Sequence, residues 1–356
     1  MTDMSSPEMD TEFVYDEGTS PCEKEDIQAF GKVFLPVLYT LVFAIGLVGN
    51  LLVTSAILKG REKRTITDIF LLNLAISDLL FVISLPFWAS YAVRGWTLGN
   101  LSCKIVSSFY YVGFFGGIFF ISLISIDRYM AIVHAAFSIR ARTVSHGFLA
   151  MLGVWIVAIL VSVPQFVFIQ RSEGKFTPNY PDMLQDIWEV FCNMEINIIG
   201  FLIPICIMGY CYCRVIRTLL SCTNRKKTTR AIRLILVVVI VFFLFWTPYH
   251  VLIFLETLKH YDFFANCSTL KFIDYGMHAT EALAFSHCCL NPVIYAFAGE
   301  KFRKYLYHLF LKCISFICVC GPCSQYKVSS PTTIPESVLS SNQTQHTSDQ
   351  DGSILL

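Results

Sequence analysis

The sequence predicts an all-α membrane protein: a seven-transmembrane helix bundle with a short cytoplasmic amphipathic eighth helix. Of the 356 residues, 55% are hydrophobic and 15% are charged, and the mean hydropathy is +0.59. A soluble domain of this length needs far more charge to cover its surface. The few charges are also absent, or nearly absent, from seven long runs. Each run approaches or exceeds the roughly 20 residues with which a helix crosses about 30 Å of hydrocarbon.

These apolar runs define the expected spans. In chain order they are Val33–Leu58, Ile69–Val93, Ile105–Ile126, Gly147–Gln170, Ile196–Cys213, Leu234–Leu255 and Phe272–Gly299. Buried helices of soluble proteins are about half as long and keep a polar stripe, whereas these runs are apolar all round. We therefore divide the chain into an acidic disordered extracellular tail (1–32), the seven-helix bundle (33–298), an amphipathic membrane-surface helix (299–312) and a disordered cytoplasmic tail (313–356).

Lysine and arginine gather in the loops on one side of the predicted bundle, most densely in residues 59–64 and 214–233. The positive-inside rule therefore predicts a multi-pass plasma-membrane protein with its N-terminus outside. The first 31 residues contain nine acids and one lysine. Such a tail is either simply solvated or a segment that wraps a basic partner, and in the second case Tyr15 is a candidate contact.

Polar motifs interrupt the apolar spans. Span three ends in Asp127-Arg128-Tyr129, span six contains Phe245-Trp246-Thr247-Pro248, and span seven ends in Asn291-Pro292-Val293-Ile294-Tyr295. Ionisable groups at mid-membrane are costly and usually functional, and proline bends a helix by removing a backbone hydrogen bond. The residues that we expect to form an activation switch are Asn50, Asp78, Trp246, Pro248, Asn291, Pro292 and Tyr295.

The outer halves of the spans offer aromatic side chains and one acid, Glu281. The expected ligand-binding residues there are Tyr39, Trp88, Tyr110, Tyr111, Tyr249 and Glu281. A carboxylate in an aromatic cavity suits a cationic group, although the neighbouring tyrosines could instead satisfy it. Span seven lacks a lysine for a retinal Schiff base, and span three has no acid above Asp127 to hold an amine ligand.

In this order the motifs resemble only the rhodopsin-like class of G-protein-coupled receptors. Within that class, Ser84-Leu85-Pro86-Phe87-Trp88, Thr280-Glu281 and the residues 287–297 look like chemokine receptors, and residues 137–143 look like CC-chemokine receptors. The likeness covers the chain from about Cys22 to Lys312. It implies a cell-surface chemokine receptor, for fractalkine or a CC chemokine, in which the ligand's flexible N-terminus enters toward Glu281.

The resemblance also implies the partners on the inner side. Asp127, Arg128, Tyr129 and Tyr212 would couple to a heterotrimeric G protein of the inhibitory class when the helices rearrange. Receptor kinases would phosphorylate the Ser/Thr-rich tail, which would then bind arrestin. The alternative is an atypical, decoy receptor that binds chemokine without signalling, and the intact Asp127-Arg128-Tyr129 argues against it.

The resemblance implies a sodium ion or water beside Asp78, although Gly117 stands where many relatives carry a hydroxyl. We expect no other cofactor, no metal site and no nucleic acid as a partner. The spans show no internal repeat typical of transporters. They also hold no facing Ser/His or Asp pair for catalysis, so an enzyme is not expected.

Fourteen cysteines are present, and relatives suggest roles for several. The pair Cys22–Cys267 resembles the family's extra disulfide. Relatives bond the cysteine at the position of Cys103 to one in the second outer loop, but residues 169–180 contain none and Phe176 occupies that place. Cys103 is therefore either free or bonded to Cys192. The candidates for palmitoylation, beside membrane lipid, are Cys313, Cys318, Cys320 and Cys323.

Overall fold

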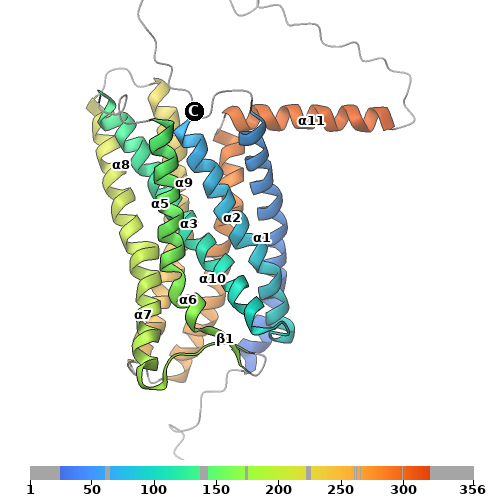
Figure 1. The fold of residues 1–356 in the computed structure, drawn as a ribbon, viewed down its shortest axis with the longest axis vertical. Helices are drawn as coiled ribbons and strands as arrows, with labels where there is room; N and C mark the ends of the chain where they lie inside the picture. The colour runs from blue at the N-terminus through green and yellow to red at the C-terminus, as the bar shows by residue number, and fades with distance from the viewer. Residues whose placement is uncertain are drawn as a thin grey trace, which may run out of the picture.

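The protein is described by a computed structural model that places residues 25–60, 65–136, 143–172, 175–221, 226–259, 261, 263–264, 266–298 and 300–320. The helices run side by side as one bundle, and the last helix lies across its end (Figure 1). They are α1 (Glu25–Lys59), α2 (Ile66–Arg94), α3 (Asn100–Val133), α5 (Val144–Val161), α6 (Val163–Phe168), α7 (Gln185–Asn197), the π-helical η2 (Ile198–Leu202), α8 (Ile203–Ser221), α9 (Lys226–Lys259), α10 (Cys267–Ala298) and α11 (Glu300–Cys320). The predicted all-helical membrane bundle is confirmed.

Membrane-crossing length is found in six helical stretches of the described chain. They are α1, α2, α3, α5 with α6, the continuous stretch from α7 to α8, and residues Val239–Lys259 of α9. The seventh helix of the bundle, α10, is not one of these six stretches, and it carries both Asp274 and Glu281. A short 3-10 turn, η1 (Asp182–Leu184), precedes α7.

Most helices extend beyond their expected spans, span five by eleven residues at its start, since α7 begins at Gln185. Two of the differences change the division of the chain. Helix α1 begins at Glu25 rather than Val33, so residues 25–32 are helical and not part of a disordered tail. The acids Glu25 and Asp26 lie in the first turn, where they favour the helix dipole, and Ile27 is buried. Helix α11 likewise continues to Cys320, past the expected end at residue 312.

Prolines shape spans four and five. Span four is divided at Ser162, just before Pro164, into α5 and α6. In span five, the π-helical segment η2 stands directly before Pro204, where the missing amide removes a helical hydrogen bond. Both spans therefore depart from a regular α-helix on the side that carries the predicted second outer loop.

Helices α2 and α3 form the centre of the bundle and approach each other closely at Gly113. A Cβ atom added there would lie 2.6 Å from the backbone nitrogen of Phe81 and 2.8 Å from the carbonyl oxygen of Ser77. One turn along α2, Trp155 of α5 donates its indole N–H to Asn73 Oδ1 at 2.9 Å. These contacts hold α2, which carries the switch residue Asp78, against α3 and α5.

Helix α11 crosses the end of the bundle that the sequence predicts to be cytoplasmic (Figure 1). Its Phe302 is buried in a cluster with Val53 of α1 and Tyr295 of α10, and Leu306 packs against that cluster. Tyr307 and Phe310, by contrast, are exposed. A helix with this apolar surface at the end of a membrane bundle suits the lipid interface, and its place there stays a prediction.

Candidate functional site

The predicted ligand-binding residues of the bundle, which we call the outer pocket, gather around Glu281 of α10. Tyr39 of α1, itself buried, donates its hydroxyl to Glu281 Oε1 at 2.8 Å. The Tyr39 ring stacks on Phe285 with centroids 5.9 Å apart, and Tyr110 of α3 lies 5.6 Å from the same ring. The acid therefore already has one tyrosine partner, and helices α1, α3 and α10 meet at this point.

The other expected aromatic residues continue this wall. The ring of Tyr110 lies 5.9 Å from Trp88 of α2 and 4.9 Å from Tyr111. Tyr249 of α9 hydrogen-bonds Tyr110, and the charge of Glu281 acts on both Tyr249 and Tyr111. The structure thus brings together all of the predicted pocket residues except Tyr15, which lies outside the described residues.

Trp246 connects this wall to the interior of the bundle. Its ring lies 6.1 Å from Tyr249, 5.0 Å from Phe114 and 6.3 Å from His287. The indole Nε1 is buried and has no hydrogen-bond partner among the residues placed by the structure. The side chain can therefore shift without breaking a polar contact, which suits a residue that senses ligand.

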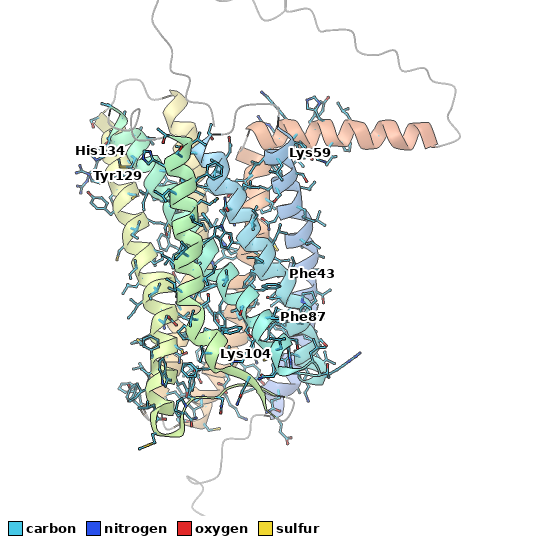
Figure 2. The ribbon with its side chains drawn as sticks, viewed as in Figure 1. Phe43, Lys59, Phe87, Lys104, Tyr129 and His134 are labelled. Carbon is cyan, nitrogen blue, oxygen red and sulfur yellow. The ribbon has the colours of Figure 1, made fainter. Side chains whose placement is uncertain are left out.

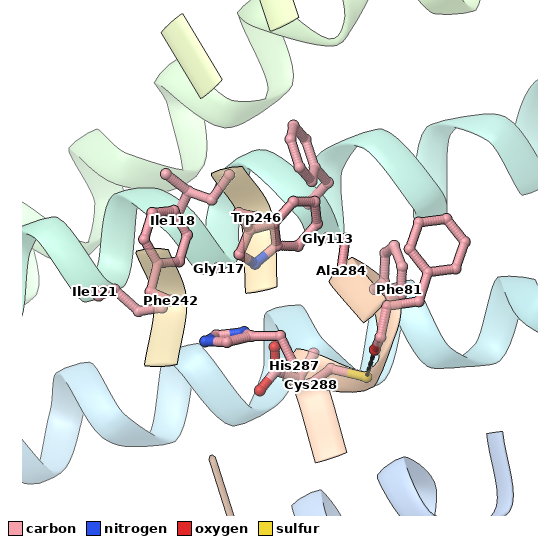
Figure 3. Close-up of a pocket in the computed structure, with 13 residues that line it drawn as sticks. Phe81, Gly113, Gly117, Ile118, Ile121, Phe242, Trp246, Ala284, His287 and Cys288 are labelled. Carbon is pink, nitrogen blue, oxygen red and sulfur yellow. Dashed lines mark hydrogen bonds between the residues drawn. The ribbon is translucent and has the colours of Figure 1, made fainter. Parts of the chain in front are cut away.

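A cavity of about 20 Å³ lies beneath Trp246, between α2, α3, α9 and α10, and it can hold one water molecule or a small ion. Figure 3 shows Trp246 and Phe242 on one wall, Gly117 on another, and His287 and Cys288 facing them. Asp78 also lines it. Asp78, the centre of the expected polar cluster, therefore borders a cavity.

Two asparagines join the helices around this cavity. Asn291 Nδ2 donates to Asp78 Oδ2 at 2.9 Å. Asn50 Nδ2 donates to the carbonyls of Gly46 at 3.0 Å and Cys288 at 3.1 Å. Asn50 therefore ties α1 to α10, and Asp78 ties α2 to α10.

The family resemblance implied a sodium ion beside Asp78, and such an ion would need oxygen ligands from the neighbouring residues. The Oδ1 atoms of Asn50 and Asn291 are buried and accept no hydrogen bond within the described part of the chain. Together with the Asp78 carboxylate they are oxygen ligands of the kind that hard cations prefer. Gly117 contributes no hydroxyl, and an added Cβ there would lie 3.7 Å from Asp78 Oδ1. Of these three oxygen-bearing side chains only Asp78 lines the cavity, so the sodium ion stays a prediction.

The hinge prolines lie inside continuous helices, Pro248 in α9 and Pro292 in α10. Pro292 is also at a close helix contact, since a Cβ added to Gly49 of α1 would lie 2.8 Å from its Cγ. Tyr295, at the end of the same motif, is buried near α11 rather than beside Tyr212. Tyr212 and Tyr295 are therefore in separate clusters here.

The inner face is closed by a three-residue lock. Arg128 forms an ion pair with Asp127 at 3.8 Å, and it also donates to the hydroxyl of Thr67. Thr67 in turn donates to Asp127 Oδ2 at 3.1 Å. The sequence motif singled out Asp127 and Arg128 but not Thr67, which belongs to no motif and is recognised only when α2 is placed beside α3.

The remaining coupling residues lie around this lock. The hydroxyls of Tyr212 and Ser125 are 3.2 Å apart, and Tyr212 lies within reach of the charge of Arg128. Tyr129 points outward instead, with its hydroxyl 2.9 Å from His134 Nε2, as Figure 2 shows at the inner end of the bundle. Arg128 and Tyr212 are thus brought together, while Tyr129 stands at the surface.

The cysteines settle the alternative left open by the sequence. Cys103 and Cys192 are both buried and both free, so no bond joins them. Cys103 lies in an apolar cluster with Trp96, Val106 and Ile169, which gives the thiol an environment without a disulfide.

The other cysteine predictions are only partly within the described chain. Cys267 is disulfide-bonded, and its expected partner Cys22 lies outside the described residues. Cys313, Cys318 and Cys320 belong to α11, and Cys323 lies beyond the described part. Palmitoylation remains a prediction.

Comparison with known proteins agrees with this geometry. Residues 49–295 match the family of the 7 transmembrane receptor (rhodopsin family), and the chain belongs to this family of G-protein-coupled receptors. It is a chemokine receptor and not an enzyme. It is 54% identical to CX3C chemokine receptor 1 of Rattus norvegicus over 99% of both chains, and 55% identical to that of Homo sapiens over 98% of this chain and 99% of the relative. C-C chemokine receptor type 4 of Homo sapiens is 47% identical over 95% of this chain and 93% of the relative.

Proposed function

We propose that this chain is a plasma-membrane receptor for fractalkine or a CC chemokine, with its N-terminus outside, that activates the inhibitory class of heterotrimeric G protein. The observation that carries the proposal is a series of contacts that begins at Glu281 and ends at Trp246. Its members, in order, are Glu281, Tyr39, Phe285, Tyr110, Tyr249 and Trp246. The similarity to CX3C chemokine receptor 1 over nearly the whole chain supports the fractalkine ligand, and the C-C receptor supports the alternative.

On the outer side, a cationic group of the chemokine N-terminus would bind Glu281. The acid now accepts a hydrogen bond from Tyr39, and a ligand cation would compete with that hydroxyl or join it. The acidic N-terminal tail, including Tyr15, would attract the basic chemokine core and speed the encounter. Ligand in the aromatic pocket would then press on Tyr249 and, one helical turn below, on Trp246.

On the inner side, activation would bend α9 and α10 at Pro248 and Pro292. The cavity below Trp246 leaves room for the indole to move, and a sodium ion or water beside Asp78 would be expelled or rearranged. Arg128 would leave Asp127 and Thr67, join Tyr212 and Tyr295, and open the face that accepts the G protein. The ligand works by shifting a two-state equilibrium, without covalent chemistry.

Receptor kinases and arrestin would then act on the cytoplasmic tail, and palmitoyl groups on the four cysteines would attach it to lipid.

The test uses the full-length receptor in membranes and the purified chemokine domain of fractalkine. We expect saturable binding and faster nucleotide exchange on an inhibitory G protein. The variant Arg128→Ala should keep binding and lose exchange, because it removes only the inner contact. Binding without exchange by the native receptor would support the decoy alternative instead. If fractalkine fails to bind and a CC chemokine binds, the ligand assignment moves to the CC class.

A further inference from the structure

We infer that Lys104 positions the second outer loop for ligand binding, in place of the disulfide by which relatives attach this loop to α3. The inference deepens the proposed function and rests on it. Cys103, the neighbour of Lys104 at the outer end of α3, is a free thiol, and residues 169–180 contain no cysteine with which it could bond. The loop must therefore be attached by other means.

Lys104 makes a contact of the required kind. Its Nζ donates to the carbonyl oxygens of Phe166 and Val167, both at 2.9 Å, and lies 5.3 Å from the centre of the Phe166 ring. Figure 2 shows Lys104 at the outer end of the bundle, beside the chain that leaves α6 for the loop.

Those two carbonyls belong to the last turn of α6, which ends at Phe168. The final carbonyls of a helix have no partner within the helix, and a cation there also favours the helix dipole. Hydrogen bonds that involve a charged donor are the stronger kind. Lys104 thus joins α3 to the point at which the outer loop begins.

From that point the loop is a hairpin that returns to the same place. Strands β1 (Ile169–Ser172) and β2 (Lys175–Pro178) are antiparallel, with Ile169 opposite Pro178. The amide of Asn179 then donates to the carbonyl of Phe168 at 2.8 Å. The start of the hairpin therefore determines where its end lies.

A second set of contacts holds the base of the hairpin, where its two ends meet, against α7. The ring of Phe168 lies 5.1 Å from Tyr180 and 4.5 Å from Trp188 of α7. Tyr180 also hydrogen-bonds Cys192 of the same helix, and burial raises the pKa of Tyr180, so its hydroxyl stays protonated and able to donate. The hairpin is therefore held between α3 and α7 by noncovalent contacts alone.

The attachment bears on the ligand pocket because the two share side chains. Ile169 of β1 is buried in the cluster of Cys103, Trp96 and Val106, and that cluster packs against Trp88 and Tyr111. Both of these aromatic residues line the outer pocket. Releasing the hairpin would loosen the wall that faces the ligand.

The first test compares variants of Lys104 and Cys103 by fractalkine binding in membranes. Lys104→Gln should weaken binding about tenfold, because it removes a charge that makes two hydrogen bonds, while the number of receptors at the surface stays constant. Lys104→Arg should keep native affinity, since a guanidinium can donate to both carbonyls. Cys103→Ser, the matched control at the neighbouring position, should bind within about twofold of native, a difference well below 1.4 kcal/mol.

The second test restores the covalent attachment that relatives use. Phe176→Cys, added to Lys104→Gln, should form a disulfide with Cys103, seen by peptide mapping without reductant, and should return affinity to the native value. Native affinity in Lys104→Gln, or a Cys103→Ser variant that loses binding as far as Lys104→Gln does, would overturn the positioning role.

A readout without ligand separates this inference from the proposed function. The hairpin contains trypsin sites at Arg171 and Lys175, and Lys104→Gln should be cut there faster than the native receptor or Cys103→Ser. Equal cleavage rates overturn the role of Lys104 whether or not any chemokine binds. If the native receptor binds no fractalkine but the cleavage rates differ as expected, only the ligand assignment fails.

Discussion

The closest contact between α2 and α3 offers the sharpest test of the bundle. In Gly113→Ala, the new Cβ would lie 2.6 Å from the Phe81 nitrogen and 2.8 Å from the Ser77 carbonyl oxygen. Both atoms belong to the backbone of α2, so no side-chain rotation relieves the clash and the two helices must move apart.

The magnitude follows from two opposing effects. Overfilling a tight contact costs about 1–3 kcal/mol. Replacing glycine by alanine inside a helix returns up to about 1 kcal/mol through lower backbone entropy in the unfolded state. The expected result is a net destabilisation of roughly 1–2 kcal/mol for Gly113→Ala.

The measurement is thermal unfolding of the purified receptor in detergent. Gly153→Ala and Gly209→Ala are matched controls, because a Cβ at either glycine meets nothing within 4 Å. They should raise the unfolding temperature slightly, whereas Gly113→Ala should lower it by about a few degrees. If Gly113→Ala melts at or above the temperature of the two controls, the close approach of α2 and α3 is wrong.

Four further variants test the pocket, the cavity and the lock. Asn50→Ala should lower stability by about 1–3 kcal/mol in the same melting assay, because it leaves a buried carbonyl of α10 unpaired; unchanged melting would contradict that contact. Glu281→Gln should reduce chemokine potency by about tenfold or more by removing the counter-charge, and Tyr39→Phe should reduce it less; the reverse order would place the ligand cation elsewhere. Thr67→Val should raise nucleotide exchange without ligand, because Arg128 loses one of its two inner contacts; basal exchange equal to native would refute the lock.

The spans were predictable, whereas their ends were not. An apolar run that crosses lipid carries a strong signal in composition alone, and the expected order of spans is correct. The first turns of α1 and the last turns of α11 lie outside the hydrocarbon, where helices need no apolar run. The start of α1 depends on contacts such as the burial of Ile27.

The residues of the candidate site likewise divide into those that the sequence could predict and those that it could not. Asp78, Trp246 and Arg128 could be named from the sequence because a polar or bulky group in a span stands out against its neighbours. Thr67 and Lys104 could not, because a threonine or lysine near a helix end is ordinary. Each acquires a role only from the residue that a neighbouring helix places beside it.

The sequence by itself determined the seven-helix membrane bundle and the positions of its polar groups. In lipid, each span must satisfy its own backbone hydrogen bonds, so hydropathy and order specify the helices. Tertiary structure alone decided which partner each buried polar group takes: Asn50 with a carbonyl of α10, Arg128 with Thr67, and Cys103 with no disulfide partner. Those pairings depend on the distance and rotation between helices, which local sequence does not encode.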